Sequence, residues 1–144
     1  MSYCTQDDIL ERISEAELIQ LTDDENTGSA DADTITRAIA DADEEIDSYV
    51  GVRHIVPLDP VPALARKLSA EMAIYNLFGR RQAGPPEHIE KRYNAAVRLL
   101  ELIAKGQASL GAQDPEGTPP TADAPQMAST NPARVFTRDK LRGF

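Results

Sequence analysis

Residues 34–62 read TITRAIADADEEIDSYVGVRHIVPLDPVP, and the fold class follows from this stretch. From Thr34 to Val50 the apolar side chains recur at steps of three and four, the period of one buried helix face. Asp33 or Thr34 can cap the start of this helix, and Gly51 suits its end. The apolar face consists of Ile35, Ile39, Ala42, Ile46, Tyr49 and Val50.

The second half of the stretch cannot continue as a helix. Three prolines fall within residues 57–62, and each removes a backbone donor from a helix interior. We therefore expect an extended crossing between two helices. Within it, Val52, Ile55 and Val56 are candidates for one short strand.

Helical patterns continue on both sides of the crossing. Pro62 suits the first turn of a second long helix that ends near Gly79, and residues 87–105 form a third. Upstream, two short helices are expected, with Thr5 and Ser14 as their N-caps. An acidic loop without apolar periodicity separates them from the first long helix. The predicted fold is all-α, a small bundle of three long and two short helices.

The chain changes character after residue 110. Residues 111–133 contain five prolines and almost no large apolar side chains, which predicts a disordered tether. Residues 134–144 then carry four apolar side chains among basic residues, namely Val135, Phe136, Leu141 and Phe144. We expect a helical domain at 1–110, a tether at 111–133 and a docking segment at 134–144. The docking segment either anchors on another chain or packs on its own domain as a closing strand or turn.

Charge is distributed unevenly along the chain. The net charge is −9, yet residues 1–51 hold fifteen acidic and two basic side chains, whereas residues 52–112 hold five acidic and nine basic ones. Oppositely charged surfaces of this kind can attract each other between copies. There is no basic stripe interleaved with aromatic residues, so specific nucleic-acid binding is not expected. No apolar run is long enough to span a membrane, and no secretory signal is expected.

Candidate chemistry is sparse. Cys4, His54 and His88 are too few for a zinc site, and Cys4 is expected to be a small buried side chain. The acidic loop lacks the bidentate glutamate that a calcium-binding EF-hand needs at its twelfth position. Asp43 and Asp47 are interpreted as parts of a solvated helix face. No catalytic, cofactor-binding or metal-binding residues are predicted, and the protein is not expected to be an enzyme.

Several ordered motifs resemble one known family. They are the opening YCTQDDIL, the helix ending in IDSYV followed by Arg53 and Pro57-Leu58, the helix ending in IYNLFGRR, the helix RYNAAVRLLELIAKG, and the terminal VFTRDKLRGF. In this order and spacing the chain resembles the head–tail connector, or head-completion, proteins of Mu-like bacteriophages and prophages. His54 departs from the pattern, in which an aromatic residue would follow the arginine.

The resemblance implies a non-enzymatic adaptor that forms an oligomeric ring at the portal vertex, completes the head and provides the tail attachment surface. Its implied partners are other copies, the portal protein and tail or stopper proteins, and its implied location is the virion after synthesis in the host cytoplasm. Candidate interface residues are Arg53, Arg80, Arg81, Val135, Phe136, Leu141 and Phe144. For the two arginines at 80 and 81, the alternative is a simple interaction with the end of their own helix. The alternative function is an acidic-face binding module, a prophage regulator or inhibitor that mimics DNA.

Overall fold

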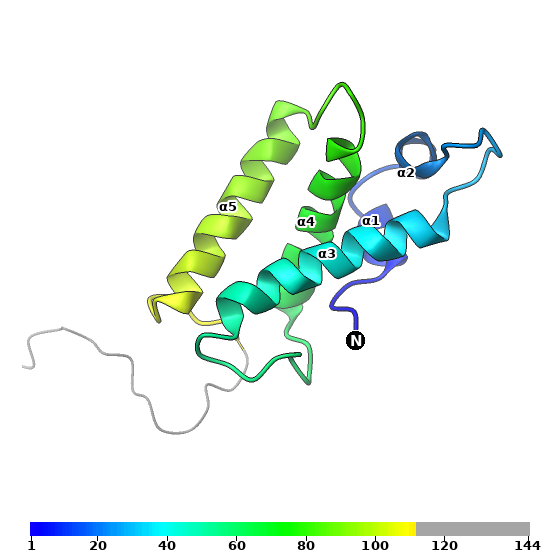
Figure 1. Ribbon diagram of the computed structural model, residues 1–144. Helices are drawn as coiled ribbons and strands as arrows, with labels where there is room; N and C mark the ends of the chain where they lie inside the picture. The colour runs from blue at the N-terminus through cyan, green and yellow to red at the C-terminus, as the bar shows by residue number, and fades with distance from the viewer. Residues whose placement is uncertain (112–144) are drawn as a thin grey trace, which may run out of the picture.

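A computed structural model describes residues 1–111 of the chain and shows five α-helices and, within those residues, no strand (Figure 1). The all-α prediction is therefore confirmed. The helices are α1 (Gln6–Leu10), α2 (Glu15–Thr22), α3 (Ala32–Val50), α4 (Ala63–Gly79) and α5 (Glu87–Ala104). The expected tether and docking segment lie outside the described residues, apart from Gly111, so the division into 1–110, 111–133 and 134–144 stays a prediction.

The caps of the two short helices match the sequence pattern. Thr5 accepts a hydrogen bond from the Asp8 amide, and the Asp8 side chain accepts one in return from the Thr5 amide at 2.8 Å, which completes a capping box. Ser14 likewise accepts from the Glu17 amide at the start of α2. The Thr5 cap thus fixes the start of α1, and the Ser14 cap lies in the turn that separates α1 from α2.

Helix α3 begins earlier than the sequence suggested. Its N-cap is Asp31, and the assignment of the cap to Asp33 or Thr34 was wrong. The Asp31 carboxylate accepts hydrogen bonds from the Asp33 amide at 3.1 Å and from the Thr34 hydroxyl at 2.5 Å. Asp33 and Thr34, the two expected caps, thus donate hydrogen bonds to Asp31, the residue that caps the helix.

Helix α4 is the centre of the bundle. It contacts each of the other four helices, and α3 and α5 also contact each other. Small side chains on α4 allow this close approach, since Ala65, Ser69, Ala70 and Ala73 are all fully buried. Aliphatic residues from every helix complete the core around them. None of the described helices is both long and apolar enough to cross a membrane.

The Pro-rich crossing is a loop, and the strand expected at Val52, Ile55 and Val56 was wrong. The Val50 carbonyl at the end of α3 accepts the amides of both Arg53 and His54, which turns the chain. The backbone amide of Leu58 donates a hydrogen bond to a side chain, the Tyr3 hydroxyl, at 2.9 Å. No neighbouring strand is present among residues 1–111 to pair with this segment.

The chain after α5 returns toward the α3–α4 loop. Gly106 has a φ of 73°, a left-handed conformation that favours glycine, and the amides of Gln107 and Ala108 return to the Leu102 carbonyl. A β-carbon at Gly106 would collide with the guanidinium of Arg53. The turn therefore brings residues 106–110 against the α3–α4 loop and buries Leu110.

Candidate functional site

The loop between α2 and α3 is acidic and internally braced. The Asp23 carboxylate accepts hydrogen bonds from the amides of Thr27 at 2.9 Å and Gly28 at 2.8 Å. The Thr27 amide, followed by the Gly28 amide, holds the pKa of Asp23 below its ordinary value. At the end of the loop the Asp31 amide donates to the buried Thr22 hydroxyl at 3.1 Å. These bonds give a fixed shape to a loop that has no hydrophobic core of its own.

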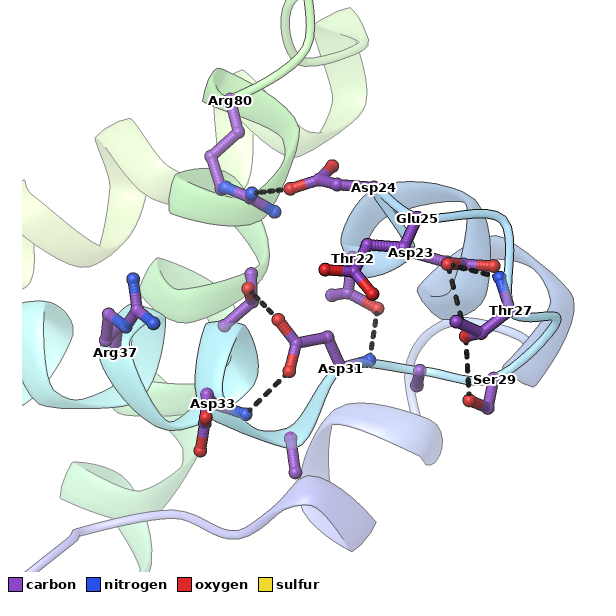
Figure 2. Close-up of a pocket in the computed structure, with 13 residues that line it drawn as sticks. Thr22, Asp23, Asp24, Glu25, Thr27, Ser29, Asp31, Asp33, Arg37 and Arg80 are labelled. Atoms are coloured by element: carbon purple, nitrogen blue, oxygen red, sulfur yellow. Dashed lines mark hydrogen bonds and ion pairs between the residues drawn. The ribbon is translucent and has the colours of Figure 1, made fainter.

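An open hollow of about 520 Å³ lies between this loop and the bundle (Figure 2). Its carboxylates come from the α2–α3 loop and the first turn of α3, and its cations are Arg37 of α3 and Arg80 beyond α4. The side chains of five acids line it, namely Asp23, Asp24, Glu25, Asp31 and Asp33. The hollow is consequently an anionic surface with cations on one wall. Among residues 1–111 no group of three or more His, Cys, Asp or Glu side chains is arranged to hold a metal ion.

Arg80 and Arg81 hold α2 against the end of α4. Arg80 donates to the Leu21 carbonyl at 3.0 Å and pairs with Asp24 at 2.5 Å. Arg81 donates to the Gln20 carbonyl at 2.6 Å and lies 3.2 Å from Asp24. Carbonyls at a helix C-terminus carry partial negative charge, so the two cations bind the end of α2 rather than the end of their own helix. Their predicted role at an interface is untested by these contacts.

Arg53 lies at the other end of α3, in the α3–α4 loop, and the structure does not bring it together with Arg80 and Arg81. It is exposed, and it is flanked by Val52 and Ile55, whose exposed fractions are 69% and 89%. The remaining predicted interface residues, Val135, Phe136, Leu141 and Phe144, lie outside the described residues. The described candidate residues therefore form two separate surfaces, at the two ends of α3.

A buried polar network was missed by sequence reasoning. Asp43 is only 8% exposed, so its interpretation as part of a solvated helix face was wrong. Its carboxylate accepts from the Tyr3 amide at 2.9 Å and from the Ser69 hydroxyl at 2.5 Å. Asp47, half-buried, accepts from the Tyr3 hydroxyl, which in turn accepts from the Leu58 amide. A signal was available, because Asp43 falls four residues after Ile39 and three before Ile46, on the inward face.

Three groups of the network, Asp43, Cys4 and Tyr3, have their pKa raised and so favour their neutral forms. Burial raises the pKa of Asp43, although the bonds from Ser69 and the Tyr3 amide oppose this. Burial also raises the pKa of the Cys4 thiol to about 11, and burial with the Asp47 bond raises that of Tyr3 to about 12. Ser69, which also donates to the Cys4 sulfur at 3.1 Å, is fully buried. The network joins the N-terminal segment to α3, α4 and the α3–α4 loop.

The expectation for Cys4 is confirmed, since it is a buried side chain just before α1. Near the other side of the bundle, Tyr75 of α4 and Tyr93 of α5 stack with ring centroids 3.9 Å apart. The Tyr93 hydroxyl donates to Glu45 of α3 at 2.7 Å, which ties the three long helices together. The tyrosines thus act in the fold of the bundle.

Comparison with known proteins identifies the family. The model of the family described as "Bacteriophage Mu, Gp36" matches residues 3–129. The chain is 29% identical over 142 residues to the Mu-like prophage FluMu protein gp36 of Haemophilus influenzae, covering 99% of this chain and 97% of that protein. It is 30% identical over 145 aligned positions to gene product J of Escherichia phage Mu, covering 100% and 99%. The chain therefore belongs to the bacteriophage Mu Gp36 family, a family of Mu-like phage proteins.

Proposed function

We propose that this protein is a non-enzymatic structural adaptor of phage assembly. It forms an oligomeric ring at the portal vertex, completes the head and provides the surface to which the tail attaches. Membership of a Mu-like phage family and similarity to a phage protein and a prophage protein along the whole chain support a role in the phage life cycle. The partners in this proposal are other copies, the portal protein and tail or stopper proteins, and the location is the head–tail joint of the virion.

The observation that carries the proposal is the difference between the surfaces at the two ends of α3, although acids such as Glu44 also lie near its C-terminal end. The helix has 19 residues, so its ends lie about 28 Å apart at 1.5 Å per residue. The five acids that line the hollow lie at its N-terminal end, and exposed Arg53, with Val52 and Ile55, lies at its C-terminal end. A contact between unlike surfaces of successive copies is heterologous, and repeated heterologous contacts form a ring when the rotation between copies closes and an open filament when it does not. Polarised subunits of this kind suit a ring better than a solitary binding module.

The docking segment, residues 134–144, adds a second contact in this proposal. Its apolar side chains Val135, Phe136, Leu141 and Phe144 anchor on a neighbouring copy or on the portal, and its basic residues suit an acidic rim. A flexible link of the length of residues 111–133 has a typical reach of about 24–29 Å, at ~5–6 Å × √n. This reach is sufficient to cross a subunit boundary.

Removal of residues 134–144 is expected to abolish assembly and leave the helical domain folded. All five described helices and the core lie within residues 1–110, so we expect the helical circular dichroism signal and the thermal midpoint to change little. Assembly is measured by complementation of a phage that lacks the gene. A full-length variant with Phe136→Ser and Phe144→Ser keeps the basic residues and tests the apolar anchors alone. Unfolding of the truncated protein, or normal complementation by it, would contradict the proposed docking role.

Electron microscopy of a lysate from a prophage that lacks this gene tests the function directly. We expect DNA-packaged or leaking heads beside free, finished tails, because the joint between them is missing. Normal infectious particles would overturn the proposal. The acidic-face binding module would then be the better explanation, and its binding to a basic DNA-handling protein should be lost in high salt.

A further inference from the structure

The α3–α4 loop displays aliphatic side chains to solvent. Within residues 1–111 the exposed large hydrophobic residues are Met1, Val52 and Ile55, and two of these three lie in this loop. Arg53 lies between them in the sequence, its guanidinium lies against Gly106 after α5, and it makes no ion pair with any residue of the described part. We call Val52, Arg53 and Ile55 the loop knob. A cation flanked by two exposed aliphatic side chains has the composition of a contact surface rather than of an ordinary solvated turn.

The backbone that carries the loop knob is fixed. The Val50 carbonyl accepts the Arg53 amide at 3.0 Å and the His54 amide at 2.9 Å. Beyond the knob, Leu58 is 4% exposed, and its amide is held by the Tyr3 hydroxyl. A surface that is ordered before binding loses less conformational entropy when its partner arrives. The backbone of the knob is therefore held in a defined position.

The opposite end of α3 offers a complementary surface. In the acidic hollow only Asp24 is paired with a cation, and within residues 1–111 the carboxylates of Asp23, Glu25, Asp31 and Asp33 have no ion pair. Arg80 is occupied by Asp24 and the Leu21 carbonyl. Small side chains of Ala30 and Ala32 lie at the same hollow. With a volume of about 520 Å³, the hollow has room for side chains of an incoming loop.

We propose that the loop knob of one copy docks in the acidic hollow of a second copy. Arg53 lies among the carboxylates there, and Val52 and Ile55 pack against Ala30 and Ala32, where they shield the charged contact from water. Arg53 after the C-terminal end of α3 and the acids of the hollow at its N-terminal end are opposite in charge, which favours a second copy as the partner. In the proposed ring, each copy gives its knob to the next copy and receives one from the previous copy, so the role of this contact in a ring rests on the proposed function.

Photo-crosslinking in cells that produce the phage tests the contact on the full chain. Benzoylphenylalanine in place of Ile55 is expected to yield crosslinks between two copies, and peptide mapping should place the crosslinked residue within 23–33. The matched control carries the same photoreactive group at Lys91 of α5, whose side chain is 72% exposed and lies outside both surfaces. This control is expected to give no crosslink between residues 23–33 and a second copy.

Charge reversal gives the second arm of the test. Arg53→Glu is expected to lower the crosslink yield at least about tenfold, because a carboxylate would then face carboxylates. Glu25→Arg with Asp33→Arg should do the same from the other side. Neither acid makes a hydrogen bond through its side chain within residues 1–111, so the loop should keep its shape. Combination of all three substitutions in one chain should restore the yield.

Other results would overturn the contact. These are crosslinks from position 55 only to another protein or only to residues 134–144, an unchanged yield in Arg53→Glu, and failure of the triple variant to recover. The proposed function fails separately, through normal particles from the deletion lysate. Crosslinked copies that stop at a twofold dimer would support the contact and count against the ring.

Discussion

Replacement of Asp43 by alanine is expected to lower the free energy of unfolding by about 3 kcal/mol. The change leaves the buried Tyr3 amide without its acceptor and the Ser69 hydroxyl with only the weaker acceptor Cys4 Sγ, and an unsatisfied buried donor costs roughly 1–3 kcal/mol. It also removes one of the two hydrogen bonds that Tyr3 makes to α3, while the bond to Asp47 remains. The expected loss is large because a domain of this size has a total stability of only about 5–15 kcal/mol.

Urea denaturation followed by circular dichroism measures this effect. Asp43→Asn is the matched control, since its side chain has the same shape and its carbonyl oxygen can still accept the Tyr3 amide. We expect a loss of about 1 kcal/mol or less for this variant. A loss below about 1 kcal/mol for Asp43→Ala would show that the network contributes little, and the assignment of Asp43 as a structural acceptor would be wrong.

The same pair of proteins gives a pH test with a defined sign. The folded protein raises the pKa of Asp43, so it binds the Asp43 proton more tightly than the unfolded chain does. This contribution to stability is full below the ordinary carboxyl pKa and falls as pH rises toward the raised one. The stability of the wild type minus that of Asp43→Asn should therefore decrease with rising pH across this window. An increase in the difference would contradict the raised pKa.

Leu77→Ala is expected to cost about 3 kcal/mol, within the range of roughly 2–5 kcal/mol for buried leucines. Leu77 is fully buried on α4, the helix that contacts all the others. Loss of its side chain removes buried apolar surface and leaves a cavity that the packed neighbours fill only in part. Alanine favours helices slightly more than leucine does, so helix propensity cannot account for the loss.

Lys67→Ala on the exposed face of the same helix is the control for Leu77→Ala. Exposed substitutions away from special features usually change stability by less than about 0.5 kcal/mol. Both variants are measured by the same urea titration, and the midpoints are compared at a common slope. Equal losses for the two variants would mean that α4 is not the centre of the packing.

The sequence was sufficient for features that depend on neighbours along the chain. Helix periodicity, the Thr5 and Ser14 caps and the proline-rich crossing were all predicted, because each depends on residues within about one turn of each other. The N-cap of α3 was misplaced by a few residues, since Asp31, Asp33 and Thr34 are all suitable caps and only tertiary placement chooses among them.

Features that depend on distant partners were not predictable in the same way. Asp43 accepts hydrogen bonds from Tyr3, 40 residues before it, and from Ser69, 26 residues after it. Because aspartate side chains are rarely fully buried, sequence reasoning assigns such a carboxylate to the solvent-exposed face of a helix. Arg80 was predicted either to lie at an interface or to interact with the end of its own helix. It donates instead to the carbonyl of Leu21, 59 residues earlier in the chain. The two-ended charge distribution was visible in the sequence, but the hollow and the fixed loop knob depend on how α3 is packed.

Tyr3 and Cys4 pair with residues that the ribosome makes much later than these two. Tyr3 is among the first residues to be synthesised, but its partner Leu58 follows 55 residues later, and Ser69, the partner of Cys4, follows 65 residues later. At about 5–20 residues per second, the latter interval lasts about 3–13 s. The Tyr3 acceptors Asp43 and Asp47 are made earlier, but the site of the N-terminal segment is complete only once Ser69 of α4 has been added. The first residues to be made can therefore reach their full set of native contacts only after α3 and the start of α4 exist.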